Sequence, residues 1–333
     1  MTGDNFVCAP ILLIGFNRPD YMVEQIEALR PARPNKIYLA VDGPRADRPE
    51  KSALCQQVRD SVKFIDWPCE IKTLFRDRNL GCKYGVSGAI TWFFDNEAEG
   101  VILEDDCRPT QDFLRFASEM LERYRDDERI GAICGFNFFN LQTDNKASYH
   151  FSRHMDVWGW ASWRRVWKDY DIDICSNTER ALAIVASSDM TPYNKKVFRK
   201  FVFDVANGLS TWDVQLALLL MERKSLTIIP RERLTVNVGF SDDRATHTAG
   251  YVFWNTEWST AGGVSFPLSH PLVVLRDEKA DTLHDKLFGA IFPRALTFIG
   301  CKFPVCRKVI DSIYTIVKGF LLLLNRCQNK GTF

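Results

Sequence analysis

Regular alternation of apolar and amphipathic segments is the feature of residues 1–135 that most restricts the possible folds. Short apolar runs with the length of strands are each followed by a stretch with helical periodicity. Such alternation is typical of βαβ units, which build a mostly parallel sheet with helices on its faces. We therefore predict an α/β fold with strands at 10–16, 36–42, 70–75, 101–104 and 130–134, and helices at 20–29, 50–64, 84–96 and 112–125.

The second half of the chain is less regular. Helices are expected at 178–187, 194–207 and 210–222, and a strand at 226–229. Trp163 and Trp167 lie at helical spacing, which predicts a buried stripe. No low-complexity linker separates the halves. We therefore predict one cooperative unit, or two lobes that share an interface, over residues 1–265, made of the halves 1–135 and 136–265. Residues 266–333 are expected to form a helical, basic and apolar extension.

Charge and cysteine content set broad limits on function and compartment. The net charge is +1, so bulk electrostatics do not favour nucleic acid as a partner. The ten cysteines show no C-x-x-C or zinc-type spacing. No basic leader precedes the first apolar run, as a signal peptide would require. We expect reduced thiols in a cytoplasmic protein.

The C-terminal segment is basic and aliphatic. From Lys286 onward there are eight Lys or Arg residues and one acid, Asp311. The apolar stretch 309–324 is too short and too charged to span a bilayer. Two interpretations remain open for this tail. It is either a packed terminal helix with a solvated basic face, or a peripheral contact with the inner face of an anionic membrane.

Three consecutive carboxylates, Glu104-Asp105-Asp106, follow the apolar run 101–103. Acids at the end of a buried strand are costly unless a cation meets them. Carboxylate oxygens suit Mg²⁺ or Mn²⁺, which often carries a phosphate ligand. Because side chains alternate along a strand, Glu104 and Asp106 are expected on one side and Asp105 on the other. An exposed acidic turn is the alternative.

Polar residues follow the other expected strands as well. The carboxyl ends of parallel strands form the edge where ligands bind in such sheets. The residues that fall at this edge are Asn17, Arg18, Asp42, Asn79 and the acidic cluster. Gly81, Gly85 and Gly88 open the next helix, but their spacing is neither the dinucleotide fingerprint nor a P-loop. The pattern predicts a metal-bound diphosphate rather than nicotinamide or NTPase chemistry.

In their order, these motifs resemble a GT-A type glycosyltransferase, in particular N-acetylglucosaminyltransferase I and bacterial nucleotide-diphospho-sugar transferases. The acidic cluster is similar to the D-x-D motif of that family. The resemblance spans about residues 10–250 and implies a Rossmann-like sheet with an irregular C-terminal acceptor half. Its motifs are Asn17-Arg18-Pro19, Val41-Asp42-Gly43, Asn79-Leu80-Gly81, Glu104-Asp105-Asp106, Gly159-Trp160, Trp212-Asp213, Ile229-Pro230, Asn237-x-Gly239 and Thr246-His247.

The resemblance implies a role for each matching residue. Asp106 would ligate Mn²⁺ or Mg²⁺, and Asp213 would be the general base. Contacts to a nucleoside-diphosphate sugar, with a UDP-sugar favoured, would come from Asn17, Arg18, Asp42, Asn79, Glu104, Asp105, Trp160 and His247. The implied activity is inverting hexosyl transfer to a hydroxyl acceptor, a glycan or glycoconjugate such as a surface polysaccharide.

Some assignments have alternatives at the residue level. Asp213 could be a plain helix cap, because it opens the expected helix after Ser210 and Thr211. The family's second acid is missing, since Val214 follows Asp213. His247 could be a late metal ligand, a diphosphate contact or a solvated loop residue. Trp160 is the tryptophan we select for a sugar contact, because a glycine precedes it.

Two other functions remain open. A non-catalytic nucleotide-sugar-binding module would keep the donor pocket and need no base. A sugar nucleotidylyltransferase on a related sheet is disfavoured, because such enzymes open with a glycine-rich loop that carries Arg and Lys after the first strand. This chain has Gly15-Phe16-Asn17-Arg18-Pro19 there.

Overall fold

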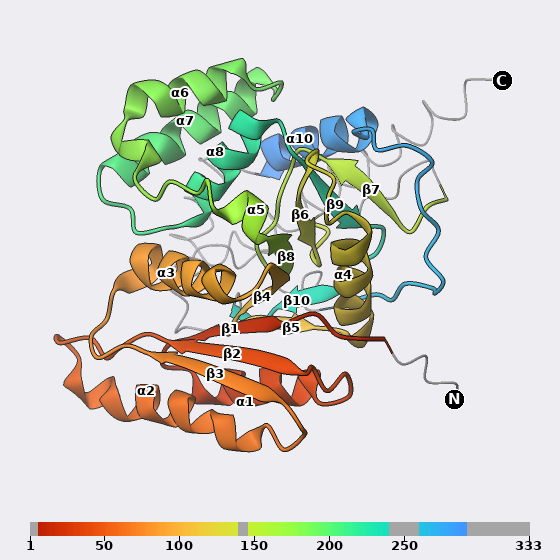
Figure 1. Ribbon diagram of the computed structural model, residues 1–333. Helices are drawn as coiled ribbons and strands as arrows, with labels where there is room; N and C mark the ends of the chain where they lie inside the picture. The colour runs from red at the N-terminus through yellow and green to blue at the C-terminus, as the bar shows by residue number, and fades with distance from the viewer. Residues whose placement is uncertain (1–5, 139–145, 240–259, 292–333) are drawn as a thin grey trace, which may run out of the picture.

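The computed structural model describes residues 6–138, 146–239 and 260–291. These residues form an eight-stranded sheet in the order β3-β2-β1-β4-β8-β6-β9-β7, and a two-stranded sheet of β10 and β5. Helices cover the large sheet, and α6, α7 and α8 form a further layer above it (Figure 1). The prediction of an α/β fold with a mostly parallel central sheet flanked by helices is confirmed.

The first half follows the predicted alternation closely. Its elements are β1 (Ile11–Gly15), α1 (Pro19–Leu29), β2 (Lys36–Val41), α2 (Ser52–Arg59), β3 (Glu70–Phe75), α3 (Gly81–Asn96), β4 (Glu99–Glu104), β5 (Cys107–Pro109), α4 (Gln111–Arg123) and β6 (Ile130–Cys134). Two 3₁₀ turns, η1 (Pro49–Lys51) and η2 (Asp60–Phe64), flank α2. The short strand β5 was not predicted, because three residues carry no readable periodicity.

The second half contains strands that the periodicity did not indicate. Its elements are β7 (Tyr149–Ser152), β8 (Trp160–Trp163), α5 (Arg164–Trp167), η3 (Ile174–Ser176), α6 (Thr178–Ser187), α7 (Pro192–Ala206), α8 (Asp213–Arg223), β9 (Leu226–Pro230), β10 (Thr235–Asn237) and α10 (Glu278–Ile291). Trp163 and Trp167 are buried as predicted, but Trp163 lies in a strand. The helical stripe was wrong because the tryptophan spacing spans a strand followed by a single helical turn.

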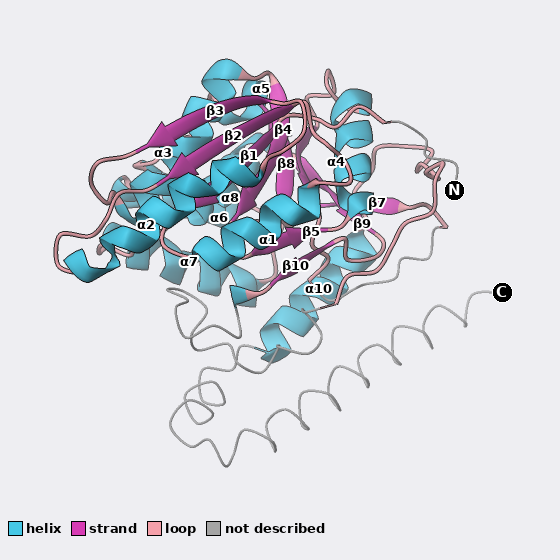
Figure 2. Ribbon diagram, turned by 90° about the horizontal axis from the view of Figure 1, so that it is seen from below, coloured by secondary structure: helices cyan, strands magenta, loops and turns pink. Residues whose placement is uncertain are grey.

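Strands β1, β2 and β4 are buried almost throughout. Helices cover a parallel sheet on both faces, so its strands consist of continuous apolar residues. Helices α1 and α2 lie on one face of β1, β2 and β3, and α3 lies on the other (Figure 1). Figure 2, seen from below, shows α1 and α2 crossing in front of these strands. The expected 50–64 helix is α-helical only over Ser52–Arg59, and 3₁₀ turns form its two ends.

The strand order contains a switch point between β1 and β4. Strands β1, β2, β3 and β4 are mutually parallel in the order β3-β2-β1-β4, with Ile14 level with Glu104. The chain leaves β1 toward β2 and later returns to its other side, so a crevice opens at the carboxyl ends of β1 and β4. Antiparallel β8 fills the position between β4 and β6, with Trp160 level with Ile102.

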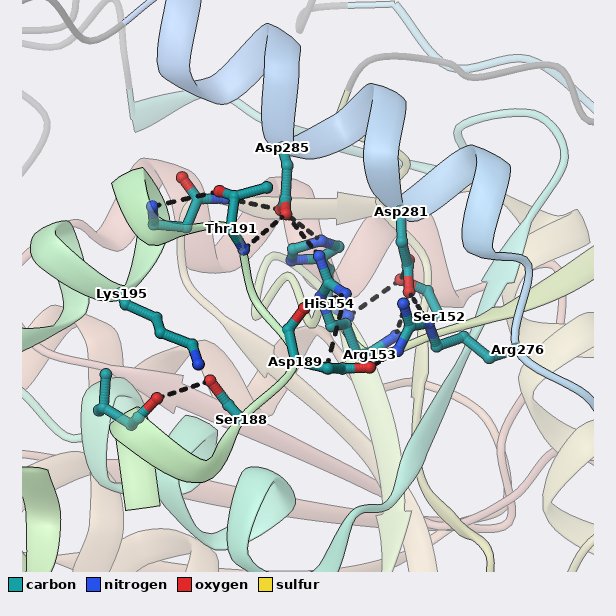
Figure 3. A network of polar contacts seen from close by, with 12 residues as sticks. Ser152, Arg153, His154, Ser188, Asp189, Thr191, Lys195, Arg276, Asp281 and Asp285 are labelled. Atoms are coloured by element: carbon teal, nitrogen blue, oxygen red, sulfur yellow. Dashed lines mark hydrogen bonds and ion pairs between the residues drawn. The ribbon is translucent and has the colours of Figure 1, made fainter. Parts of the chain in front are cut away.

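Helix α10 is fastened by two buried carboxylates (Figure 3). Asp281 accepts hydrogen bonds from the Ser152 hydroxyl (2.5 Å) and the Arg153 backbone N–H (3.3 Å). Asp285 accepts one from the Asn194 side chain at 2.6 Å and forms an ion pair with Arg153. The extension predicted from residue 266 therefore packs its first helix against the end of β7 and against α7.

Within the described ranges, no helix combines the length and the apolar character needed to cross a membrane. The apolar stretch 309–324 lies outside the described residues.

Candidate active site

The crevice between β1 and β4 brings a cation onto the acidic cluster. Arg18 occupies the N-cap position of α1. Its Nε donates to Asp105 Oδ2 at 3.2 Å, and its Nη2 donates to Asp105 Oδ1. Its Nη1 lies 3.4 Å from Asp106 Oδ2. One guanidinium thus bridges two consecutive carboxylates, so Asp105 and Asp106 do not lie on opposite sides. The prediction of alternation was wrong here because the strand ends at Glu104 and the two aspartates form a turn.

Asp105 is the buried member of the cluster, with 4 % of its surface exposed. Burial raises the pKa of its carboxyl to about 6, and the charge of Arg18 opposes this rise. The two-point contact with Arg18 supplies the compensation that a buried carboxylate requires. Asp105 therefore acts mainly as the anchor of Arg18.

Side chains from α1 and β5 hold the acidic turn in place. Gln25 is fully buried, and its Nε2 donates to the backbone oxygens of Glu104 and Cys107, both at 2.8 Å. Arg108 donates to the backbone oxygen of Asp105 at 2.6 Å. The turn is therefore built by the fold and does not depend on a ligand for its shape.

The segment after β10 packs directly on Asp106. The Val238 backbone N–H donates to the Asp106 backbone oxygen at 2.8 Å, and the Asn237 side chain accepts from the Gly239 N–H at 2.8 Å. A Cβ at Gly239 would lie 2.6 Å from Asp106 Oδ2. The glycine is required by this close approach, and the motif Asn237-x-Gly239 therefore meets the acidic cluster in space.

Four carboxylates, those of Glu104, Asp105, Asp106 and Asp213, line the same cleft. Burial raises the pKa of Glu104 well above its usual range, and the charges of Asp106, Asp105 and Asp213 raise it further. Burial also raises the pKa of the Cys82 thiol, with contributions from Glu104, Asp213 and Asp106. Mutual repulsion of this kind favours a bound cation. Carboxylate oxygens are the ligands that Mg²⁺ and Mn²⁺ prefer, so Asp106 and Glu104 fit the predicted metal.

Asp213 is the first residue of α8. Its Oδ1 accepts from the Val214 N–H at 2.9 Å and from the Thr211 hydroxyl. The residue before it, Trp212, stacks on Trp160 with ring centroids 5.8 Å apart. The N-cap position of α8 is Trp212 and no side chain caps the helix, so Asp213 is not the plain helix cap that the sequence left open. Its carboxylate lines the cleft that contains the acidic cluster.

Asp42 and Asn79 define the other end of the cleft. Asp42 accepts hydrogen bonds from the backbone N–H groups of Gly43 (2.9 Å), Leu80 (3.0 Å) and Gly81 (3.2 Å). Burial raises the Asp42 pKa, and these N–H groups oppose the rise. Asn79 donates to the Gly43 backbone oxygen at 3.1 Å. The loops after β2 and β3 are therefore bound to each other around one carboxylate.

A cleft of about 430 Å³ joins these parts. Of the predicted site residues, those that line it are Arg18, Asp42, Asn79, Glu104, Asp105, Asp106 and Asp213. Asn17 lines a small neighbouring hollow with Arg48 and Lys51. Trp160 is not on the wall: it is 1 % exposed and lies behind Trp212. His247 lies outside the described residues.

Several lining residues were not selected from the sequence. Arg76 follows β3 directly and Arg45 follows β2 by a few residues, so the strand-end rule could have found both. Trp158 lines the cleft in place of Trp160, because the strand that begins at Trp160 turns that residue into the core. Cys82 also lines the cleft, and no local motif singled it out; Asn237, which lines it too, was already part of the motif Asn237-x-Gly239.

A second group of metal-type ligands lies elsewhere. Within the described part of the chain, His154, His284 and Asp285 bring one ligand atom each to within 4.8 Å of one another. Asp285 is already bound to Arg153 and Asn194 in the contact that fastens α10 (Figure 3). We assign this group to the packing of α10.

Comparisons with known proteins do not name a function. No protein-family model and no curated protein matches the chain. HddC from Yersinia pseudotuberculosis, also solved as a complex with GMP-PN, is similar in structure at 10 % identity and a TM-score of 0.30. The match covers 49 % of this chain and 80 % of that one.

Two further solved structures are similar at 8 % identity. One is 4-diphosphocytidyl-2C-methyl-D-erythritol synthase from Anaerococcus prevotii, with a TM-score of 0.28, 61 % of this chain and 87 % of that one covered. The other is a UDP-glucose pyrophosphorylase, with a TM-score of 0.30 and coverages of 66 % and 90 %. These names are closer to the nucleotidylyltransferase alternative than to a glycosyltransferase, and GT-A membership is not confirmed. TM-scores of 0.30 and below support neither alternative, so the proposed function rests on the geometry of the site.

Proposed function

We propose that the protein is a metal-dependent inverting glycosyltransferase that uses a nucleoside-diphosphate sugar. The observation that carries this proposal is the placement of Asp213 in one cleft with Glu104 and Asp106. A carboxylate that opens a helix and faces a metal-type acidic cluster is suited to act as a base beside a bound diphosphate.

The donor would extend along the cleft from Asp42 to Asp106. The loops around Asp42 and Asn79 would receive the base, with a uracil favoured by the resemblance. Arg18 would stand beside the diphosphate, where its guanidinium already contacts Asp105 and Asp106. A divalent cation held by Asp106 and Glu104 would neutralise the charge that develops on the leaving diphosphate.

Asp213 would take the proton from the acceptor hydroxyl as that oxygen attacks the anomeric carbon. A base on the face opposite the leaving group gives inversion without a covalent intermediate. The Thr211 hydroxyl, which donates to Asp213 Oδ1, would hold the carboxylate in orientation. Trp158 could pack on the apolar face of a sugar, since its ring lines the same cleft. The acceptor class is a glycan or glycoconjugate.

A second candidate is a sugar nucleotidylyltransferase, which joins a nucleoside triphosphate and a sugar phosphate with release of pyrophosphate. One observation favours it: three guanidinium groups, from Arg18, Arg45 and Arg76, line the cleft and suit a triphosphate. The turn after β1 disfavours this candidate, because a glycine-rich loop is expected there. In Gly15-Phe16-Asn17-Arg18-Pro19 the only glycine is the first residue.

Two assays separate the candidates. The first measures release of UDP or GDP from the corresponding sugar nucleotides, with and without Mn²⁺ and with candidate glycan acceptors. The second measures pyrophosphate release from each nucleoside triphosphate with sugar phosphates. We expect Mn²⁺-dependent turnover in the first assay only. Pyrophosphate release alone would establish the second candidate.

Variants test the residue roles within the first assay. Asp213→Asn should lower kcat by about 100-fold or more while donor binding is retained, because a lost general base costs about 10²–10⁴ in rate. Asp106→Asn should abolish the Mn²⁺ dependence of donor binding. Donor binding by wild type without turnover under any condition would instead indicate a non-catalytic binding module.

A further inference from the structure

Tyr21 lies beside two arginines that hold the acidic turn. It is the third residue of α1, which begins at Pro19. The Cζ atom of Arg18 lies 5.2 Å from the centre of the Tyr21 ring, and the Cζ atom of Arg108 lies 5.0 Å from it. Both distances are within the range at which a guanidinium is attracted to an aromatic ring. One half-buried tyrosine therefore attracts two cations that come from different elements.

The two guanidinium groups bind different parts of Asp105. Arg18 binds its carboxylate through Nε and Nη2, and Arg108 donates to its backbone oxygen at 2.6 Å. Both arginines are largely buried, with 16 % and 12 % of their side chains exposed. The attraction between a cation and a ring is stronger where water is excluded. The Tyr21 ring is therefore a further restraint on the side chain and on the backbone of the acidic turn.

The Tyr21 hydroxyl reaches the segment that packs on Asp106. It donates to the Val238 backbone oxygen at 3.4 Å, while the Val238 N–H donates to the Asp106 backbone oxygen at 2.8 Å. The bond from the hydroxyl is long for an O–H donor, so we expect it to contribute less than the ring. Tyr21 thus acts on Asp106 through its neighbours.

The position of Arg18 decides whether Asp106 is open to a metal. Arg18 binds Asp105 through two nitrogens, but its Nη1 and Nη2 each lie 3.4 Å from Asp106 Oδ2. A guanidinium that moved closer to Asp106 would compete with a divalent cation, because the two cations would repel each other at one carboxylate. A ring that keeps Arg18 on Asp105 therefore leaves Asp106 to the metal.

We propose that Tyr21 is a positioning residue of the metal site: its ring holds Arg18 on Asp105 and so keeps Asp106 available to the cation. The inference rests on the proposed function, because it requires that Asp106 bind a metal. It adds a residue of α1 that does not belong to the described wall of the cleft.

Titration calorimetry of the full chain with Mn²⁺ tests the proposal. Tyr21→Leu removes the ring and keeps an apolar side chain, and its Kd for Mn²⁺ should rise by about tenfold. Tyr21→Phe keeps the ring and loses only the hydroxyl, so its Kd should stay within about twofold of the wild-type value. A merely structural role would lower the melting temperature of the metal-free protein and leave the Kd of the folded protein unchanged.

A matched control is available on α3. Tyr84→Leu removes a tyrosine ring that lies 5.1 Å from Lys83 Nζ, and it should bind Mn²⁺ as wild type does. If wild type binds Mn²⁺ and Tyr21→Leu binds it equally well, the proposal is wrong and the proposed function is unaffected. If Tyr21→Phe is as weak as Tyr21→Leu, the hydroxyl positions the site instead of the ring, and the proposal is also wrong. Wild type that binds no Mn²⁺, alone or with UDP or GDP, would overturn the metal site and the proposed function together.

Discussion

The hydroxyl of Ser210 accepts a hydrogen bond of 3.1 Å from the backbone N–H of Lys83, in the first turn of α3. This bond joins the segment before α8 to the helix whose preceding loop holds Asp42. Thr211, the next residue, donates to Asp213. The two ends of the cleft are therefore connected through two adjacent hydroxyl residues.

Removal of this connection should impair turnover more than folding. Ser210→Ala loses one exposed hydrogen bond, worth about 0.5–1.5 kcal/mol. We expect kcat/KM for the sugar nucleotide to fall by about 2–10-fold. Ser210→Thr keeps the hydroxyl and serves as the matched control. Steady-state kinetics measure kcat/KM for both variants. A kcat/KM in the alanine variant equal to that of wild type would contradict a positioning role.

Gly239→Ala should weaken metal binding without altering a ligand. The added Cβ would lie 2.6 Å from Asp106 Oδ2, so the carboxylate or the loop has to move. We expect the Kd for Mn²⁺ to rise by about tenfold, equivalent to about 1.4 kcal/mol. Titration calorimetry measures the change. Val238→Ala shortens the neighbouring side chain without approaching Asp106, and should bind Mn²⁺ as wild type does.

Arg18→Met should destabilise the fold in a pH-dependent way. It leaves Asp105 buried without its guanidinium, and a broken buried pair costs about 3–5 kcal/mol. The loss should be largest at about pH 8 and should shrink at about pH 5, because protonation of Asp105 removes the uncompensated charge. The free energy of urea unfolding at both pH values tests this.

The double variant Arg18→Met/Asp105→Asn is the control for that experiment. With both charges gone, most of the lost stability should return at about pH 8. A double variant as unstable as Arg18→Met would show that the guanidinium contributes through packing and not through its charge.

Mn²⁺ affinity should rise with pH. Burial raises the Glu104 pKa well above its usual range, so metal binding has to displace a proton at higher pH than it would at an ordinary carboxyl. The apparent Kd should therefore decrease as the pH rises. Glu104→Gln should bind more weakly and lose most of this dependence. A pH-independent Kd in wild type would contradict the participation of Glu104.

Asp285→Ala should loosen α10. Its carboxylate is buried and takes contacts from Arg153 and Asn194, so its removal breaks a buried ion pair and leaves the Asn194 amide without this acceptor. We expect a loss of about 3 kcal/mol or more. Glu278→Ala, on the same helix but exposed, should change stability by less than about 0.5 kcal/mol. Denaturant unfolding and hydrogen exchange at α10 distinguish the two.

The parallel half of the fold could be predicted from the sequence because its signals are local. Each buried strand is a continuous apolar run and each helix repeats its pattern over several turns. The strand-end rule therefore placed Arg18, Asp42 and Glu104 at one edge. The edge itself depends on the order of strands, and only the structure shows that Arg18 bridges two aspartates.

The second half of the fold was harder to predict from the sequence, because its strands are short and pair with segments that are distant in the chain. Strand β8 is antiparallel and inserted between strands that precede it in the sequence, so its tryptophans were misread as helical. The contact of Gly239 with Asp106 joins segments far apart in the chain, and no local pattern encodes it. The prediction that Trp160 lines the site was wrong for the same reason: no local pattern shows that Trp160 is buried and that Trp158 lines the cleft instead.

The insertion of β8 also limits how the chain can be divided. Strand β4 pairs with β1 on one side and with β8 on the other, so a fragment that ends near residue 135 would leave a long apolar edge open to intermolecular pairing. During synthesis, the edge of β4 stays unpaired until β8, which ends at Trp163, has left the ribosome. A truncated gene product therefore has to extend beyond residue 163 to cover this edge.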